Sequence, residues 1–445
     1  MSDTIEKIFV EAIGKFNEIK DYIDFMDKYI QSSNSRIVKA NREAYLIGGY
    51  LETLGNKNSK LPIKENERLL NEAKKISDKY IEIIENNKEK NIIIYKNKIK
   101  TKNIDVEKSK SEIEKAFERE NMFFNSILLN IIITFEATIG KIFLYYINHY
   151  PEAYLSDENI NYAKIMELSS INEIKKIITE EQVSKIMHKG IQEWFDKLSN
   201  KHKIKIKFED NTLDEFYEVY YRRNILVHNE LIVNKEYLNN IPKSLKKPKE
   251  GAYLKINMQY IQNAILLAKK IIINLLYNIE AKEEKTKIMI EEMDAYAFYC
   301  MLEKEWKFSS YIYKILMNDY RNNEQEKLYA KINYWQSTKR MGKMDLIKNE
   351  IESLDVSACD KIFKLAKEVL LEKNKEAVET LEAIYNKQDG ITQFEIEEWP
   401  LFLEFRKTKE FKNFKEKHIE DFLERGKHIE ELSDEEILNV LYTKN

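Results

Sequence analysis

Apolar residues recur at the helical period along most of this chain. In the first segment, one apolar stripe follows positions three and four apart: Ile5, Ile8, Phe9, Ala12, Phe16 and Ile19. Turn punctuation is sparse, because the 445 residues include only 10 Gly and 5 Pro. This combination favours long helices over a strand-rich fold. The sequence therefore predicts an all-α protein.

The helical pattern is longest over residues 112–147, shortly before Pro151. Since proline disfavours helix in the residue before it, we expect the helix to end there. Other helices are predicted over 161–168, 171–178, 181–198, 213–231 and 256–279. Two lysine-rich stretches alternate with a period of two, which indicates a brief strand or an extended connector in 86–105 and in 200–212.

These patterns divide the chain into three regions. We expect an N-terminal helical region with a Lys/Asn-rich connector (1–108), a helical bundle (109–290) and a C-terminal domain of short amphipathic hairpins (291–445). The last region is helical-repeat-like, yet it has no clean tetratricopeptide repeat of about 34 residues. Helical stacks often bind a regulatory protein or support a dimer. The alternative is that these helices only complete the core.

Charge and cysteine usage narrow the possible partners. With 73 basic and 76 acidic residues, the chain has no large net charge that would attract it to nucleic acid or to a membrane. Attraction to a polyanion must therefore come from local basic patches. Cys300 and Cys359 are too far apart in sequence for a paired motif. They indicate a reducing, cytoplasmic environment.

Neither a signal peptide nor a membrane span is expected. The first residues mix acids and lysines without an apolar run. The most apolar window, from Ser126, is interrupted by Asn130, Glu136 and Lys141, which would be costly in lipid. A buried bundle helix explains this window better.

The segment "YYRRNILVHNEL" (220–231) concentrates polar chemistry in an apolar helical run. Arg222 lies one turn after Glu218, which suits an ion pair. Arg223 precedes His228 by five residues and so lies about 140° around the helix from it. Either the helix frays near His228 or a second copy of the helix completes a site. The simpler alternative is that the two arginines only neutralise Glu218 and a buried Glu136. One helix face carries Tyr217, Tyr221, Asn224 and His228.

The wider string around this segment resembles the motif of HEPN domains (higher eukaryotes and prokaryotes nucleotide-binding). It comprises Glu218, Arg222-Arg223-Asn224, Val227-His228-Asn229, Val233 and Tyr237. Parts of the upstream sequence, including Pro151-Glu152, are also similar, and the resemblance covers residues 109–285. A glycine often follows the histidine segment by two residues in the family, whereas Leu231 stands there in this chain.

The resemblance implies an all-helical and often dimeric fold, and in many members a metal-independent endoribonuclease of bacterial toxin or abortive-infection (phage-defence) systems. The site then forms where two motif helices meet across a two-fold axis. His228 would act as acid–base or orient the ribose hydroxyl. Arg223 would hold phosphate oxygens, and Asn224 would orient the imidazole or the phosphate. The supporting residues would be Glu218, Arg222 and Asn229.

Exposed lysines on either side of the motif helix could form a basic rim for RNA. The candidates are Lys203, Lys205, Lys207, Lys246 and Lys247. Such charge runs are usually only a solvated surface. The remaining histidines share no metal-ligand spacing, so we expect no metal and no other cofactor. Three functions remain open: an RNA-cleaving homodimer, a non-catalytic bundle that binds RNA, a nucleotide or a protein, and a helical interaction protein.

Overall fold

The computed structural model describes residues 4–55, 67–78, 81–84, 92–95, 106–155, 170–208, 210–283, 286–319, 321–387, 390–419 and 422. Helices dominate these residues, which confirms the all-α prediction. The described residues form two compact units, 1–276 and 277–445. This division differs from the predicted three regions. The N-terminal helices share a unit with the bundle. The one boundary between the units follows residue 276, whereas the sequence predicts a boundary after residue 290.

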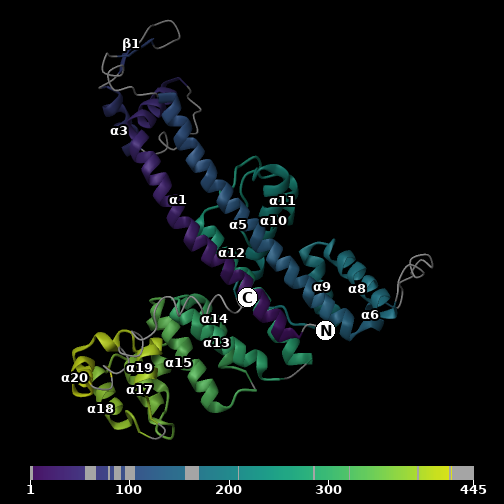
Figure 1. The fold of residues 1–445 in the computed structure, drawn as a ribbon, viewed down its shortest axis with the longest axis vertical. Helices are drawn as coiled ribbons and strands as arrows, with labels where there is room; N and C mark the ends of the chain where they lie inside the picture. The colour runs from purple at the N-terminus through teal and green to yellow at the C-terminus, as the bar shows by residue number, and fades with distance from the viewer. Residues whose placement is uncertain are drawn as a thin grey trace, which may run out of the picture. The chain divides into compact units, whose positions relative to one another are not determined.

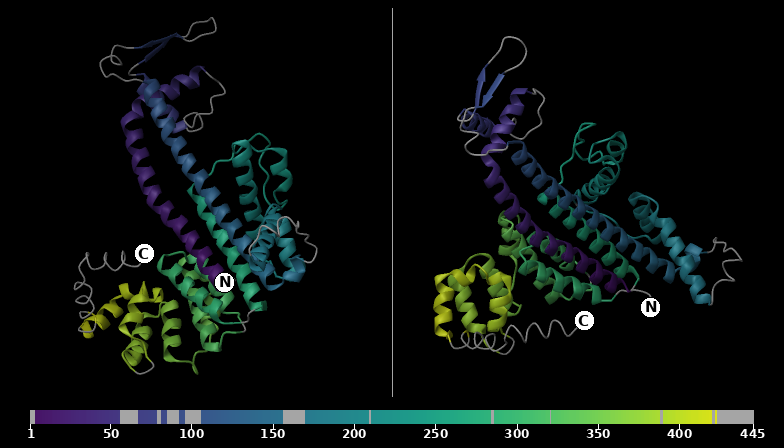
Figure 2. Two further views of the ribbon diagram at one scale, coloured as in Figure 1. Left: turned by 45° about the vertical axis from the view of Figure 1, so that its right-hand side comes forward. Right: turned by 45° about the horizontal axis from the view of Figure 1, so that its top comes forward.

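The first unit is built on two long helices. Helix α1 (Ile5–Gly55) lies beside α5 (Val106–His149) along much of its length (Figures 1 and 2). The predicted stripe of α1 is the reason: Ile5, Phe9 and Phe16 are almost fully buried. Because α1 buries this face against α5, the two helices belong to one compact unit.

The other elements of the first unit lie along this pair. Helix α3 (Glu67–Ser77) and an antiparallel hairpin of β1 (Ile81–Ile84) and β2 (Ile92–Tyr95) lie at the end where α1 finishes (Figure 1). Strand β2 falls within the predicted strand or connector of residues 86–105, and the rest of that stretch lies outside the described residues. The remaining helices are α6 (Pro151–Leu155), α8 (Ile171–Met187), α9 (Ile191–His202), α10 (Thr212–Asn229), α11 (Lys235–Asn240) and α12 (Met258–Glu283), whose last turns belong to the second unit.

Helix ends agree with the sequence predictions in part. Helix α5 ends at His149, two residues before Pro151. Helix α8, by contrast, continues through the break predicted after residue 178, and the chain turns at Gly190 instead. Residues 203–208 are an extended loop without regular structure, one of the two predicted alternatives. The helix predicted over 161–168 lies outside the described residues.

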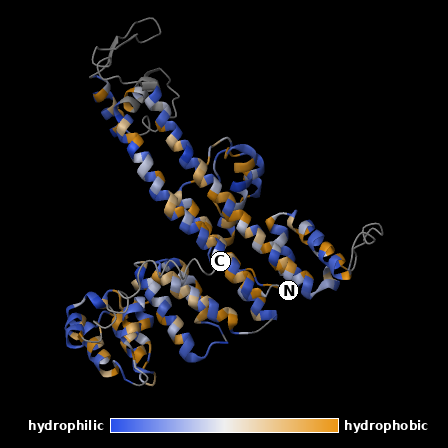
Figure 3. Ribbon diagram, viewed as in Figure 1, coloured by the Kyte–Doolittle hydropathy of each residue, from blue (hydrophilic) through white to orange (hydrophobic). Residues whose placement is uncertain are grey.

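Helix α5 is the central helix of the first unit's core. Its buried face includes Leu128, Ile131, Phe135 and Ile139, and Figure 3 shows its concentration of hydrophobic residues. Among the described residues, one helix is long and apolar enough to cross a membrane, Ser111–His149 within α5, and half of its most apolar window is buried. Because the core helix of a soluble protein passes the same test, this property alone does not indicate a membrane.

The second unit consists of shorter helices. They are α13 (Ile288–Leu302), α14 (Trp306–Leu316), α15 (Glu324–Arg340), α16 (Lys348–Ser353), α17 (Lys361–Leu370), α18 (Asn374–Ile384), α19 (Gln393–Glu398) and α20 (Lys409–Lys417), with 3₁₀ turns η1 (Met344–Leu346), η2 (Pro400–Phe402) and η3 (Phe405–Lys407). One of the short hairpins predicted for this region is formed by α17 and α18. One apolar core joins α15 to α20 and includes Trp335, Leu365 and Phe402.

Candidate functional site

The motif helix α10 is fixed at its beginning by a buried lysine. Lys270 of α12 is 6% exposed, and its Nζ donates to Asp210 Oδ2 (2.9 Å) and Thr212 Oγ1 (3.3 Å). Asp210 also accepts the backbone N–H of Thr212, the first residue of α10. Burial opposes the charged carboxylate, but the bonds from Thr212 and Lys270 prevail and lower the pKa of Asp210 to about 2.

The middle of α10 is held by the Glu218 carboxylate. Its Oε1 accepts bonds from Arg222 Nε (2.7 Å) and from the Tyr237 hydroxyl of α11, and its Oε2 accepts the Tyr260 hydroxyl of α12 (2.9 Å). The Arg222 guanidinium lies over the Tyr260 ring, 4.1 Å from its centroid, and donates to the Lys255 carbonyl (3.3 Å). The predicted Glu218–Arg222 pair is therefore part of a network that joins three helices.

The protonation states in this network follow from its surroundings. Burial, and then the neighbouring Glu218 carboxylate, raise the pKa of Tyr237 and Tyr260 above the usual tyrosine value. Both phenols therefore stay protonated and act as donors. Burial opposes the charge of Arg222, but its oxygen neighbours Tyr260 and Glu218 raise its pKa overall. Since the side chains of Arg222 and Glu218 are only 16% and 15% exposed, both have a structural role.

Arg223 points to the core helix instead of to solvent. Its Nη2 forms an ion pair with Glu136 of α5, and its guanidinium lies 4.9 Å from the Tyr220 ring centroid. Among the described residues, Arg223 Nε is buried without a hydrogen-bond partner. Burial and the nearby Glu136 carboxylate raise the pKa of Tyr220 to about 12. Both ion pairs of the simpler alternative, Arg222 with Glu218 and Arg223 with Glu136, are therefore formed in the structure.

His228 lies at the other extreme of exposure. Its side chain is exposed on the last turn of α10, next to Val227, which is 53% exposed, and Asn224 one turn earlier is half-buried. Within the part of the chain that the structure describes, neither the His228 nor the Asn224 side chain has a hydrogen bond or ion pair. The Asn224 face of the helix is not sealed in the core, and the imidazole is accessible to a ligand.

The chain reverses direction directly after His228 through two left-handed residues. Glu230 has φ 50° and Leu231 has φ 62°, a conformation that costs about 1–2 kcal/mol per non-glycine residue. Leu231 thus takes a glycine-like backbone conformation. It is held there because its side chain is buried and its carbonyl accepts the Leu254 N–H (2.9 Å). The Asn229 amide donates to the Ile232 carbonyl (2.6 Å) in the same turn, which gives Asn229 a structural role.

The candidate lysines are all exposed and lie on loops. The period-two pattern reflects a loop whose two sides differ in exposure. Ile204 is buried on one side, and the other side exposes Lys203, Lys205 and Lys207. Lys246 and Lys247 follow α11, and Lys247 Nζ donates to the Leu238 carbonyl. Tyr217, by contrast, packs on Phe195 with 6.1 Å between ring centroids.

The structure brings together only part of the predicted site. Glu218 and Arg222 are joined, whereas Arg223 and His228 make no contact with each other in the described residues. The sequence pattern gave no signal for Tyr260 or Lys270, because their partners are more than 40 residues away in the chain. Among the described residues, no cluster of three or more His, Cys, Asp or Glu side chains could hold a metal ion.

Comparison of this chain with protein-family models, with curated proteins and with solved structures returns no match.

Proposed function

We propose that this protein is a metal-independent endoribonuclease with a HEPN-like bundle, acting in the cytoplasm in phage defence or as a toxin. The RNA 2′-oxygen attacks the adjacent phosphorus, the bond from phosphorus to the 5′-oxygen breaks, and a 2′,3′-cyclic phosphate forms. The 2′-hydroxyl loses a proton in this step and the leaving 5′-oxygen gains one. The reaction therefore needs one group that transfers protons and another that stabilises a phosphorane dianion.

The observation that carries this proposal is the state of His228. An exposed imidazole without a partner among the described residues, on the last turn of a helix anchored at three points, is positioned to exchange protons with a bound ligand. Asn224 on the same face has a carboxamide that no described residue binds, and it could orient the imidazole or a phosphate oxygen. The lysines of the 203–207 loop would supply attraction to the RNA backbone.

Arg223 faces away from His228 in one chain, so we propose that the arginine comes from a second chain. In a two-fold dimer, the same patch contributes twice, and the arginine of one subunit meets the histidine of the other. Arg223 would then leave or share Glu136 in favour of the phosphate. Because a guanidinium has five donors and Glu136 uses only one nitrogen of it, both partners can be held together.

One observation favours a second candidate function. The Glu136 carboxylate neutralises the charge of Arg223 within a single chain, as expected for a purely structural arginine. In that case the bundle is a non-catalytic scaffold that binds RNA, a nucleotide or a partner protein, and His228 contributes only to a surface.

Incubation of the purified chain with mixed RNA in excess EDTA tests the enzymatic proposal. We expect cleavage that leaves 2′,3′-cyclic phosphate ends and falls by a factor of about 100 or more in Arg223→Ala and in His228→Ala. His188→Ala is the matched control, because His188 is also an exposed histidine at the end of a helix. Its activity should equal that of the wild type.

The alternatives give different results in this assay. Equal cleavage by the wild type and both variants would assign the activity to a contaminant or to another site. RNA retention without cleavage would favour the scaffold.

A further inference from the structure

A cavity of about 490 Å³ lies within the second unit, which does not contain the motif helix. Its walls come from the ends of α15 and α17, the start of α18 and the turns η2 and η3. Val369, Leu401 and Phe405 form an apolar wall, and Gln336 of α15 lines the same space. Cavities of this size hold a small ligand or the side chains of a short peptide.

Gln336 is unusual among the buried polar residues. It is 2% exposed, and in the described part of the chain neither its Nε2 nor its Oε1 has a hydrogen-bond partner. Its neighbours on α15 are satisfied: Asn333 Oδ1 accepts Trp399 Nε1 (2.8 Å), and Ser337 Oγ donates to Ser309 Oγ (3.3 Å). Since buried polar groups are nearly always paired, an amide with both ends unpaired indicates a partner from outside the chain.

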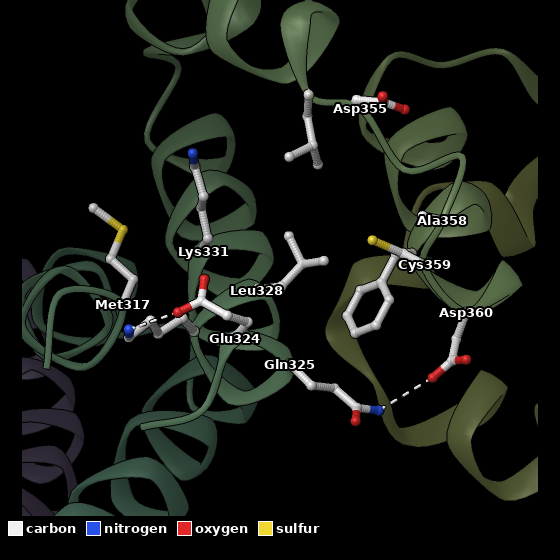
Figure 4. A pocket seen from close by; sticks show the side chains of 12 residues that line it. Met317, Glu324, Gln325, Leu328, Lys331, Asp355, Ala358, Cys359 and Asp360 are labelled. Carbon is white, nitrogen blue, oxygen red and sulfur yellow. Dashed lines mark hydrogen bonds and ion pairs between the residues drawn. The ribbon is translucent and has the colours of Figure 1, made fainter. Parts of the chain in front are cut away.

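A second cavity in the same unit provides a comparison. It measures about 530 Å³ and is also lined by a glutamine, Gln325. Figure 4 shows that its polar groups bind one another: Gln325 Nε2 donates to Asp360 Oδ2 (3.2 Å) and Lys327 Nζ to Glu324 Oε1 (2.8 Å). The polar groups in that cavity need no ligand, in contrast to Gln336.

We propose that the Gln336 cavity binds an extended polypeptide segment that carries an aliphatic side chain. The Gln336 carboxamide has a donor beside an acceptor, and because both atoms are enclosed, the side chain must turn toward the cavity to present them to the peptide. In an extended peptide, the N–H and C=O of one residue point to the same side and match this pair, as they do between strands. The aliphatic side chain of the peptide then packs against Val369, Leu401 and Phe405. In this mode of recognition the backbone hydrogen bonds provide affinity, and the apolar pocket provides specificity for the side chain.

The charges around the cavity argue against an anionic ligand. Lys339 is paired with Glu372 (2.9 Å) and donates to the Leu370 carbonyl (2.8 Å), and Arg340 is paired with Glu404 (2.8 Å). A phosphate would have to break these pairs, whereas a neutral peptide leaves them intact. This inference concerns a different part of the chain from the motif helix, so it holds whether or not the protein cleaves RNA.

The test uses capped single residues and the full-length chain. We expect N-acetyl-leucine N-methylamide to bind with a Kd on the order of 1 mM in ligand-observed NMR, as its size allows. The fully N-methylated analogue lacks the backbone donors and should bind at least about tenfold more weakly. No binding of the leucine probe, or equal binding of both probes, would overturn the proposal.

Substitutions locate the binding and separate it from folding. Gln336→Leu should weaken binding of the leucine probe about tenfold. The melting temperature should stay equal or rise, because the substitution replaces a buried unpaired amide with an apolar group. Asn374→Trp should block the cavity at its rim, and Lys375→Trp, on the next residue and outside the lining, should bind the probe normally. A lower melting temperature in Gln336→Leu with unchanged probe binding would show a structural amide and refute the site.

Discussion

The Glu218 carboxylate accepts hydrogen bonds from three elements, so its removal tests how α10 is held. Glu218→Ala would leave Arg222 buried and charged without its anion, and would also strand the hydroxyls of Tyr237 and Tyr260. Removing one partner of a buried pair typically costs about 3–5 kcal/mol. We expect the free energy of unfolding of the first unit to fall by about 3 kcal/mol, measured by urea titration.

A matched pair on α8 provides the control for Glu218. Glu180 and Lys176 have the same four-residue spacing as Glu218 and Arg222 but are 61% and 74% exposed. Glu180→Ala should therefore change the free energy of unfolding by only about 0.5 kcal/mol. Similar losses in both variants would contradict the view that Glu218 organises the motif helix.

Glu136 determines how available Arg223 is to a phosphate. The carboxylate binds Arg223 Nη2 and contributes a negative charge beside the proposed site. Glu136→Gln keeps the shape of the side chain and removes that charge, so we expect RNA to bind roughly two- to fivefold more tightly in a filter-binding assay at low salt. Weaker binding would mean that Glu136 holds Arg223 in its RNA-binding position.

Local patterns in the sequence predicted single elements well and their partners poorly. The apolar stripe of α1, the end of α5 before Pro151 and the extent of α10 follow from periodicity and proline chemistry. The prediction broke α8 after residue 178 and joined its last turns to α9, because the apolar residues of α8 are spread nearly uniformly around the helix and mark neither of its ends. The partner of Asp210 could not be predicted, because Lys270 looks like a surface lysine in the sequence.

At the scale of elements, the Asp210–Lys270 pair links the start of α10 to α12, and pH tests this link. The pKa of Asp210 is about 2 in the folded chain, against an ordinary value of 3.8. A lowered carboxylate pKa stabilises the fold above about pH 4, and that stability is lost as the pH falls through about 2. Asp210→Asn should therefore lower the melting temperature by about 2–4 °C at pH 7.

The difference between this variant and the wild type should shrink below pH 4 and vanish only well below pH 2, where the wild-type carboxylate is protonated as well. Calorimetry across this range measures both chains. A difference that is independent of pH would show that the side-chain shape of Asp210, and not its charge, holds α10.

At the scale of the whole molecule, the proposed site requires two chains. Arg223 faces α5 and His228 faces solvent, so a single chain does not bring the pair together in this structure. A homodimer should give twice the chain mass of 53.2 kDa by light scattering at micromolar concentration. A strict monomer that still cleaves RNA would contradict the composite site.

Mixing two inactive variants separates a site shared between chains from one within a chain. In a dimer of one Arg223→Ala chain and one His228→Ala chain, one site keeps an arginine and a histidine and the other site loses both. If subunits exchange freely, half of the dimers are mixed and each has one intact site, so roughly a quarter of the wild-type activity should return. A site confined to one chain would leave the mixture as inactive as either variant alone. The control mixture of His228→Ala with itself fixes the background, and cleavage at that background level in an exchanged sample would exclude the two-chain arrangement.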